Sequence, residues 1–379
     1  AMRTFLFLFL LSLSVRLGTL FLIPQDQIPP NPNWETGAVS ISLASTGDFA
    51  DPYLIPTGPT AHMPPVYVAA MSLVYRILGT GFVGGLVRWI LIMLAYSTLW
   101  ALLPWIGESL GMGRKAGILG GLAGALFVTF PSELESFSAL ALALIAMAFF
   151  LRWKGNAESG GREWRLFLMG LALGTAFHLQ PVLLVVVLGY MAFELWWCHG
   201  KGSWQPVALM TLGMLLACLP WGVRNYTAFH QAYFIRSNFG LELYVGNHDG
   251  AHADIDVSAA RGSFQHPRTD RAEAERVLEL GEGLYMAEKQ GEALDWIRAN
   301  PGEFLKLTGT RVLYFWVGPL HKGSGAAPYL ILALMAMVGV LRVFPSMKAS
   351  QRAALLLPLA TYPLVYYVVA YMPRYGEPV

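Results

Sequence analysis

Apolar residues occupy long blocks along most of this chain, and polar residues are confined to the stretches between them. A helix needs about 20 predominantly apolar residues to cross the hydrocarbon core of a bilayer. Nine blocks reach or approach that length, and they cover residues 4–23, 82–103, 116–131, 135–152, 164–180, 181–198, 204–222, 326–344 and 354–372. The pattern therefore predicts an all-α, multi-pass membrane protein with about nine spans.

The composition agrees with this prediction. Of the 379 residues, 55% are hydrophobic and 13% are charged. The net charge of +2 is too small to indicate a nucleic-acid partner, so membrane lipids are the expected surroundings. Both cysteines, Cys198 and Cys218, lie in or beside apolar blocks, which argues against a disulfide framework or a thiolate metal site.

The basic residues predict an orientation. Short connections at 114–115, 152–165, 201 and 342–352 hold Arg and Lys, and the positive-inside rule places such loops in the cytoplasm. Counting crossings from a cytoplasmic N-terminus puts all of them inside, provided that residues 302–320 do not cross. Lys306 and Arg311 would make a lipid-exposed span there costly, so this segment is predicted to be an amphipathic helix on the outer surface.

Three parts of the chain follow from this topology. Residues 1–222 form a transmembrane core with an exoplasmic first loop at 24–81, residues 223–325 form an exoplasmic helical lobe with the surface helix, and residues 326–379 hold the last spans. Within the lobe, a Glu-, Ala- and Leu-rich stretch predicts two soluble helices broken near Gly281. We expect functional residues in the two exoplasmic segments, because they hold most of the polar chemistry.

The first loop contains a short stretch that predicts a surface helix. Apolar residues recur at helical spacing over residues 34–46, and Asn33 precedes them as a predicted N-cap. Glu35 then lies in the first turn, where the helix dipole favours an ionised carboxylate that can accept a proton or bind a cation. The alternative is that Glu35 only stabilises the helix, since acids are common in first turns.

Two more acids follow Glu35 within the same loop. Asp48 and Asp51 flank Phe49-Ala50, where ordinary turn chemistry is the alternative to a functional role. The stretch "PTGPTAHMPPVY" then packs four prolines and His62 into twelve residues, so this part of the loop is predicted to be stiff and folded back toward the bilayer. No Lys or Arg occurs in residues 33–68, so this segment is predicted to present a negatively charged surface next to the lipid.

Cationic residues are predicted on the same side of the membrane. Arginine forms forked hydrogen bonds with phosphate oxygens, and the phosphate of a lipid would lie at this depth. The alternative is that each cation anchors a helix by contacting lipid headgroups. The residues concerned are Arg224, Arg236, Lys306, Arg311 and Arg374.

The order of these motifs resembles a known family. The motifs "WETGAVSISLA", "TGDFADPY", "PTGPTAHMPPVY", "PWGVRNY", "IRSNFGLELYVGN" and "PRYGEP" are similar to those of integral-membrane glycosyltransferases with the GT-C fold. They look most like the bacterial branch related to protein O-mannosyltransferases and the lipid A aminoarabinose transferase. The resemblance implies a GT-C bundle with exoplasmic surface helices, in the bacterial inner membrane, with its active site on the periplasmic side.

The resemblance also implies a reaction. Members of this family transfer a sugar from a polyprenyl-phosphate donor to a hydroxyl of a glycan, lipid or protein acceptor, with inversion at the anomeric carbon. Glu35 matches the catalytic base best, but relatives often carry an Asp-Glu pair there, so Asp48 and Asp51 stay as alternatives. Family members usually continue beyond the "RY..P" motif, so a C-terminally truncated chain is expected. The phosphate is expected at Arg224, Arg236, Arg374 and Tyr375, with Arg311 and Lys306 as further candidates.

A few other polar residues complete the prediction. His62 and Glu135 are expected in the same cavity, as is His178, which otherwise serves as a polar residue at a helix end. The cluster of His248, Asp249 and His252 could hold a divalent cation, although its spacing matches no established metal motif. The pattern identifies no cofactor with certainty and leaves dependence on a divalent cation open.

Three other functions are compatible with parts of the pattern. A lipid or solute transporter would show ionisable residues near the membrane midplane and matching broken helices in two halves, and neither is seen. A ligase or polymerase of polyprenyl-linked glycans could also use outer arginines and an acid. An inactive relative that acts as a binding subunit would look much the same.

Overall fold

The structure is a computed structural model, and it describes residues 2–378 except 128–131, 156–162, 200–202, 232, 320, 323–326 and 377. Part of the predicted span at 116–131 and much of the basic connection at 152–165 therefore lie outside the described residues. Within the described part the chain is all-helical, and strand pairing is limited to two isolated bridges, Ala50–Pro59 and Asp254–Tyr371. The prediction of an all-α protein is confirmed.

The helices follow one another with short connections. The first half contains α1 (Met2–Leu20), α2 (Glu35–Ser45), α3 (Pro65–Leu78), α4 (Phe82–Ser109), α5 (Arg114–Phe127), α6 (Glu133–Lys154), α7 (Glu163–Leu179) and α8 (Leu183–His199). The second half contains α9 (Gln205–Phe229), α10 (Phe239–Gly246), α11 (Ile255–Ala260), α12 (Arg271–Leu280), α13 (Glu282–Ala299), α14 (Pro301–Val317), α15 (Ala327–Val343), α16 (Ala349–Thr361) and α17 (Leu364–Val368). Short 3-10 turns lie at Gln25–Gln27, Phe344–Ser346 and Pro373–Gly376, the last of which is η4.

Four helices of the described chain are long and apolar enough to cross a membrane, namely α1, α4, α6 and α9. The predicted spans at 116–131, 164–180, 181–198 and 326–344 coincide with the shorter helices α5, α7, α8 and α15, which have 14 or 17 residues. The predicted span at 354–372 is not one helix, because the chain breaks between α16 and α17 near Pro363. Within the described residues, membrane-spanning length is thus seen at four of the nine predicted positions.

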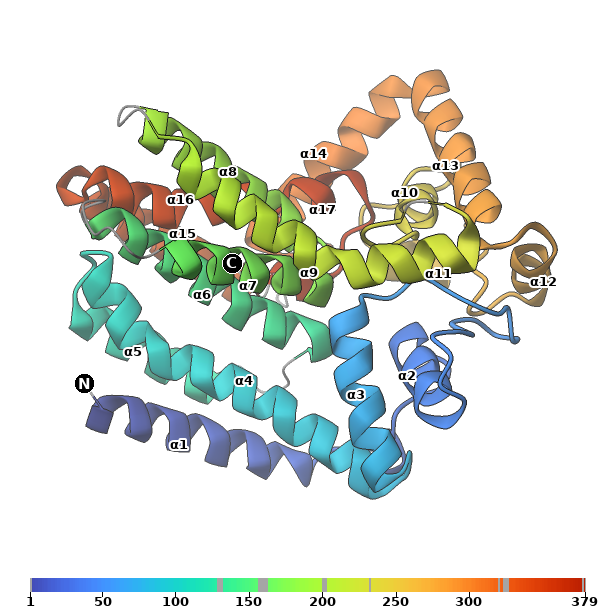
Figure 1. The fold of residues 1–379 in the computed structure, drawn as a ribbon, viewed down its shortest axis with the longest axis horizontal. Coiled ribbons are helices and arrows are strands. Elements are labelled where there is room, and N and C mark those ends of the chain that lie inside the picture. Colours follow the sequence, from blue (N-terminus) through green and yellow to red (C-terminus); the bar gives the residue numbers. More distant parts are fainter. Residues whose placement is uncertain are drawn as a thin grey trace.

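The long helices lie side by side, while the short helices gather at one end of the bundle. Figure 1 shows α2, α3 and α10 to α13 together toward its right-hand side, and the C-terminal part of α9 reaches into the same region. In the bundle α7 packs on α9, and α4 packs on both α1 and α5. The segments predicted to be exoplasmic therefore meet on one side of the bundle.

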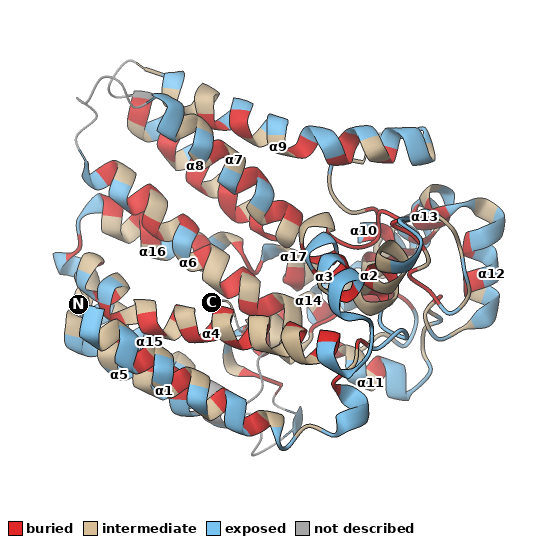
Figure 2. Ribbon diagram, turned by 60° about the horizontal axis from the view of Figure 1, so that its bottom comes forward, coloured by how far each residue is buried: buried red, intermediate tan, exposed pale blue. Residues whose placement is uncertain are grey.

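The outer faces of the bundle are apolar. On α9, Leu212, Leu215 and Leu219 are exposed, and Leu6, Phe7 and Leu10 are exposed on α1. Figure 2 shows the same alternation of buried and exposed stripes along these helices. Exposed leucines at helical spacing are expected where a helix faces lipid, so this surface agrees with a membrane protein.

The short helices follow the predicted pattern with two differences. Helix α2 begins at Glu35 as expected, but its N-cap is Trp34 and no side chain caps it, so the prediction of Asn33 as the cap is wrong. Helices α12 and α13 meet at Gly281, whose φ of 77° favours glycine. Helix α14 forms where the surface helix was expected, but Arg311 on it is fully buried instead of facing the surface.

Candidate active site

A cavity of about 1170 Å³ lies at the end of the bundle where the short helices gather. Its wall comes from the first loop, the starts of α4 and α6, the α7–α8 corner, α10, the loop before α12 and η4. Ligand pockets for small molecules commonly measure roughly 300–1,000 Å³, so this cavity has room for a sugar, a phosphate and part of a lipid. Segments more than 300 residues apart in sequence, such as Glu35 and Arg374, thus share one cavity.

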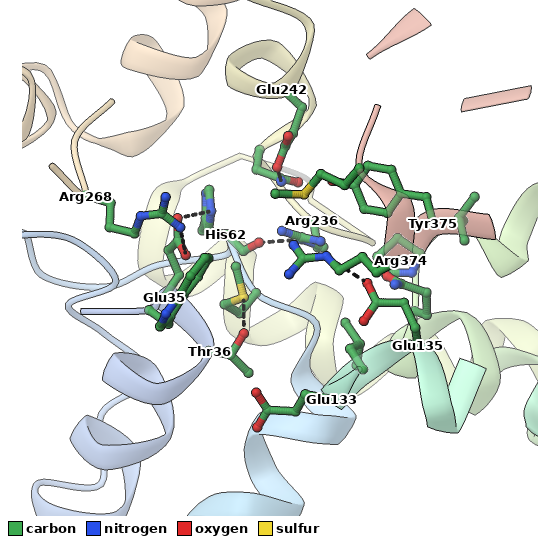
Figure 3. A pocket seen from close by; sticks show the side chains of 18 of the residues that line it. Glu35, Thr36, His62, Glu133, Glu135, Arg236, Glu242, Arg268, Arg374 and Tyr375 are labelled. Carbon is green, nitrogen blue, oxygen red and sulfur yellow. Dashed lines mark hydrogen bonds and ion pairs between the residues drawn. The ribbon is translucent and has the colours of Figure 1, made fainter. Parts of the chain in front are cut away.

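Glu35 lies at one end of this cavity and contacts three side chains. Its carboxylate accepts a hydrogen bond from Arg268 Nη1 at 3.4 Å, and it lies 3.8 Å from His266 Nε2 and 4.0 Å from His62 Nε2. The Arg268 guanidinium also stacks on the Trp34 ring at 4.2 Å. Glu35 is only 8% exposed, so its carboxylate is held in one place by these neighbours (Figure 3).

The two histidines beside Glu35 are neutral near pH 7. Burial lowers the pKa of His266 to about 4, although the nearby Glu35 opposes the shift. Burial also lowers the pKa of His62 well below its usual value, and Arg236 adds to the effect. His62 Nδ1 lies 3.0 Å from the Tyr53 hydroxyl, which fixes the orientation of the ring. Arg268 is therefore the cationic partner of Glu35.

Arg236 lies in the middle of the cavity. Its Nε donates to the backbone carbonyl of His62, and the side chain is half-buried. Among the described residues it has no carboxylate within ion-pair distance, whereas the other three arginines that line the cavity do. These other pairs are Arg268–Glu35, Arg88–Glu133 at 3.0 Å and Arg374–Glu135 at 3.3 Å. Arg236 is thus available to an anionic ligand.

Arg374 and Tyr375 lie on the opposite side of Arg236 from Glu35 (Figure 3). Arg374 Nε has no hydrogen-bond partner in the described structure, although Glu135 lies close to it. Burial raises the pKa of Tyr375 above its usual value, so the phenol keeps its proton and can donate a hydrogen bond. The structure therefore brings Arg236, Arg374 and Tyr375 together, as the sequence predicted.

Glu282 was not predicted as a site residue, yet it holds two walls of the site together. Its buried carboxylate accepts hydrogen bonds from Ala61 N at 2.7 Å, Ser237 Oγ at 2.6 Å and Thr60 Oγ1. Thr60 and Ala61 precede His62, while Ser237 follows Arg236 in sequence. Glu282, from the first turn of α13, therefore fixes the distance between the loop that carries His62 and the segment that carries Arg236.

Several predicted residues lie outside the lining of the cavity. Asp51 closes a turn, because its Oδ1 accepts from Gly58 N at 2.8 Å, and Asp48 lies in the exposed turn after α2. Of the three acids proposed as the base, the structure brings Glu35 to the cavity and leaves Asp48 and Asp51 outside it. His178 is buried within α7, where Nδ1 contacts the Gly174 carbonyl at 3.1 Å.

Three predicted phosphate-binding cations are also outside the lining. Arg224 donates to the carbonyls of Phe49 and Thr60 at 2.6 and 2.7 Å, so it ties α9 to the first loop. Arg311 donates to the carbonyls of Gly246 and Val368 and is fully buried. Lys306 is exposed and pairs with Glu303, one turn away on α14. These three cations therefore contact backbone carbonyls or lie at the surface, and of the five predicted cations Arg236 and Arg374 line the cavity.

The predicted metal cluster does not converge in the structure. His248 Nδ1 contacts the Asp249 carbonyl, Asp249 Oδ1 accepts from Trp296 Nε1, and His252 Nδ1 accepts from Asp254 N. Within the part of the chain that the structure describes, no group of three or more His, Cys, Asp or Glu side chains is placed to hold a metal ion. These residues order the lobe through local hydrogen bonds instead.

His266, Arg268 and Glu242 line the cavity but were missed from the sequence. The available signal was "HPR" at residues 266–268, since a proline between two chemically active side chains stiffens a loop. Glu242 lies inside the quoted motif "IRSNFGLELYVGN" on the face of α10 that lines the cavity. Neither sequence pattern indicates which residues, distant in sequence, these side chains contact in the fold.

Comparison with models of protein families, with curated proteins and with solved structures finds no match to this chain. The geometry of the cavity and the sequence motifs are therefore the basis for assigning a function.

Proposed function

We propose that this chain is an inverting glycosyltransferase that moves a sugar from a polyprenyl-phosphate donor to an acceptor hydroxyl. The observation that carries the proposal is one cavity with the Glu35 carboxylate at one end and Arg236, Arg374 and Tyr375 toward the other. This reaction needs a carboxylate that acts as a base and accepts a proton, and it needs cations that bind a phosphate. The resemblance to GT-C glycosyltransferases adds the class of donor.

The proposed reaction is a single displacement. The acceptor hydroxyl attacks the anomeric carbon while Glu35 takes its proton, and the bond between that carbon and the phosphate oxygen breaks. The polyprenyl phosphate leaves with the electron pair, and Arg236 and Arg374 stabilise the negative charge that grows on it. The phenol of Tyr375 donates a further hydrogen bond to the same oxygens.

Arg268 and the two neutral imidazoles have a positioning role in this proposal. They surround the Glu35 carboxylate and leave little freedom for its side chain, because it is almost fully buried. A base that is already held in the reactive orientation reacts faster than a mobile one, because the entropy cost of orienting its side chain was met on folding.

The proposal includes a membrane topology. The shorter apolar helices α5, α7, α8 and α15 to α17 would complete a GT-C bundle with α1, α4, α6 and α9. The distribution of Lys and Arg supports a cytoplasmic N-terminus and a site on the periplasmic side of a bacterial inner membrane. In that orientation the phosphate of a lipid-linked donor would enter at the level of Arg236.

Transfer of labelled sugar tests this function. Membranes that contain the protein are given a panel of labelled polyprenyl-phosphate sugars, with and without a chelator, and label in glycan, lipid and protein fractions is counted. Glu35→Gln should lower the transfer rate by about 10²–10⁴-fold, the usual contribution of general-base catalysis. Asp48→Asn is the matched control, because it removes a first-loop carboxylate outside the cavity and should leave the rate unchanged.

The outcomes separate the alternatives. Transfer that survives Glu35→Gln with the wild-type rate would refute the role of Glu35. Absence of transfer from every donor would refute the glycosyltransferase and favour a transporter or an inactive subunit. Transfer of a whole lipid-linked glycan in place of a single sugar would identify a ligase or polymerase.

A further inference from the structure

Helix α10 brings one more acid into the cavity, and neither the proposed base nor the proposed phosphate site uses it. Glu242 accepts a hydrogen bond from Asn238 Nδ2 at 2.9 Å, and both residues line the cavity. Among the described residues, no cation lies within ion-pair distance of Glu242, in contrast to Glu35, Glu133 and Glu135. Figure 3 shows Glu242 extending from its helix toward the centre of the cavity.

The position of Glu242 relates it to the phosphate site. Arg236 and Arg374 are the cations whose charges act on it, and its own charge acts on Tyr375. An ionised carboxylate here would compete with a phosphate for the two arginines. Burial, however, raises the pKa of Glu242, although Arg236 and Arg374 oppose the shift. A carboxyl group accepts hydrogen bonds from sugar hydroxyls, and it also donates one when it is protonated.

The surroundings of Glu242 also suit a sugar. Phe239, Glu242 and Val245 are spaced three residues apart, so they share one face of α10, and all three line the cavity. Phe264 and Ile255 pack against the hydrophobic cluster that contains Val245, and both line the cavity. Apolar and aromatic walls with a few polar groups are typical of small-molecule sites, and sugars offer C–H faces to the former and hydroxyls to the latter.

We propose that Glu242, held by Asn238, is the group that recognises the hydroxyls of the transferred sugar, next to the phosphate held by Arg236 and Arg374. This inference rests on the proposed glycosyltransferase function and extends it to the specificity of the donor site. Glu242 determines how much the sugar adds to donor binding, while the affinity for the lipid phosphate alone depends on the two arginines.

Binding of two probes by the purified full chain tests the inference. A polyprenyl phosphate and the same lipid carrying mannose, glucose or galactose are titrated, and the ratio of the two affinities measures the contribution of the sugar. In wild-type protein the preferred sugar should tighten binding, and Glu242→Ala should reduce this gain by about tenfold, the effect of one to two lost hydrogen bonds. Affinity for the bare lipid phosphate should change by less than about twofold, since the arginines are intact.

Two further variants make the result specific. Glu242→Gln keeps a side chain that donates and accepts, so it should retain most of the gain from the sugar or redirect it to another sugar of the panel. Glu279→Gln is the matched control, because it changes an exposed acid of α12 outside the cavity, and it should behave as wild type.

The experiment separates failure of this inference from failure of the proposed function. A Glu242→Ala protein that keeps the wild-type affinity ratio overturns the role of Glu242 while the donor site stands. An equal loss of both affinities also overturns it, because Glu242 would then only position the arginines. Wild-type protein that binds neither probe would refute the proposed function and, with it, the inference.

Discussion

Replacing Glu282 with alanine should destabilise the exoplasmic end of the protein. The carboxylate is 6% exposed and accepts three hydrogen bonds, from Ala61 N at 2.7 Å, Ser237 Oγ at 2.6 Å and Thr60 Oγ1. Alanine removes the two carboxylate oxygens that accept these three hydrogen bonds. The two hydroxyls can turn toward other acceptors, but the backbone N–H of Ala61 cannot, so it is left unpaired in a buried position.

The structure allows the size of this effect to be worked out. A hydrogen bond to a charged group contributes about 1.5–3 kcal/mol, and a buried donor left unpaired costs about 1–3 kcal/mol. Burial raises the pKa of Glu282 against the opposing hydrogen bonds of Ser237 and Thr60, so part of this gain is offset by the cost of burying the carboxylate. The net loss in the free energy of unfolding should be about 3 kcal/mol, or roughly 4 °C in melting temperature for a chain of 379 residues.

Thermal unfolding of the detergent-purified protein measures this loss. Glu279→Ala is the control, because it removes an exposed acid from the preceding helix and should shift the melting temperature by less than about 1 °C. Glu282→Gln keeps an acceptor oxygen and should lose about half as much as alanine does. A Glu282→Ala protein that melts with the Glu279→Ala control would refute the idea that this carboxylate holds the first loop to the segment of Arg236.

Two other changes test the site directly. Because burial lowers the pKa of His266 from its ordinary 6.5 to about 4, the unfolded chain binds a proton that the folded chain does not, and stability is lost as the pH falls from about 6.5 toward 4. His266→Gln should therefore reduce the loss of melting temperature over that range, and an unchanged loss would contradict the assignment of a neutral His266. Arg224→Gln should lower the melting temperature with less than about twofold change in affinity for a polyprenyl phosphate, whereas Arg236→Gln should weaken that affinity by about tenfold or more at a nearly unchanged melting temperature. Equal effects of the two variants on both quantities would refute the separation of a structural from a ligand-binding arginine.

Local pattern predicted the helices well because each depends on residues close in sequence. The apolar periodicity located α2 and α14, and Gly281 marked the break between α12 and α13. The lengths of the spans were less predictable. Pro363 divides the last predicted span into two helices. Whether a helix of 17 residues crosses a membrane depends on its packing against other helices, which cannot be derived from the local sequence. The all-α class followed from pattern, while the number of spans did not.

The site was partly predictable for the same reason. Glu35 was correctly predicted to lie in the first turn of a helix, because that position depends only on where α2 begins. Its partner Arg268 lies 233 residues away, and no local rule pairs the two. Arg224 and Arg236 are equivalent by residue type, but the fold separates them. Arg224 donates from both terminal nitrogens to backbone carbonyls outside the cavity, whereas Arg236 donates its Nε to the His62 carbonyl and lines the cavity.

The charges of the cavity also bear on the stereochemistry of the proposed reaction. Arg268, Arg88 and Arg374 are each paired with a carboxylate, whereas Arg236 has no carboxylate within ion-pair distance among the described residues. A phosphate would therefore meet less competition from a paired carboxylate at Arg236 than at Arg268 beside Glu35. In the proposed reaction, the base at Glu35 and the phosphate at Arg236 would lie at different places in one cavity. Attack from the side of Glu35 with departure toward Arg236 is the arrangement that inverts the anomeric carbon, and it argues for direct displacement over a covalent glycosyl-enzyme intermediate on Glu35.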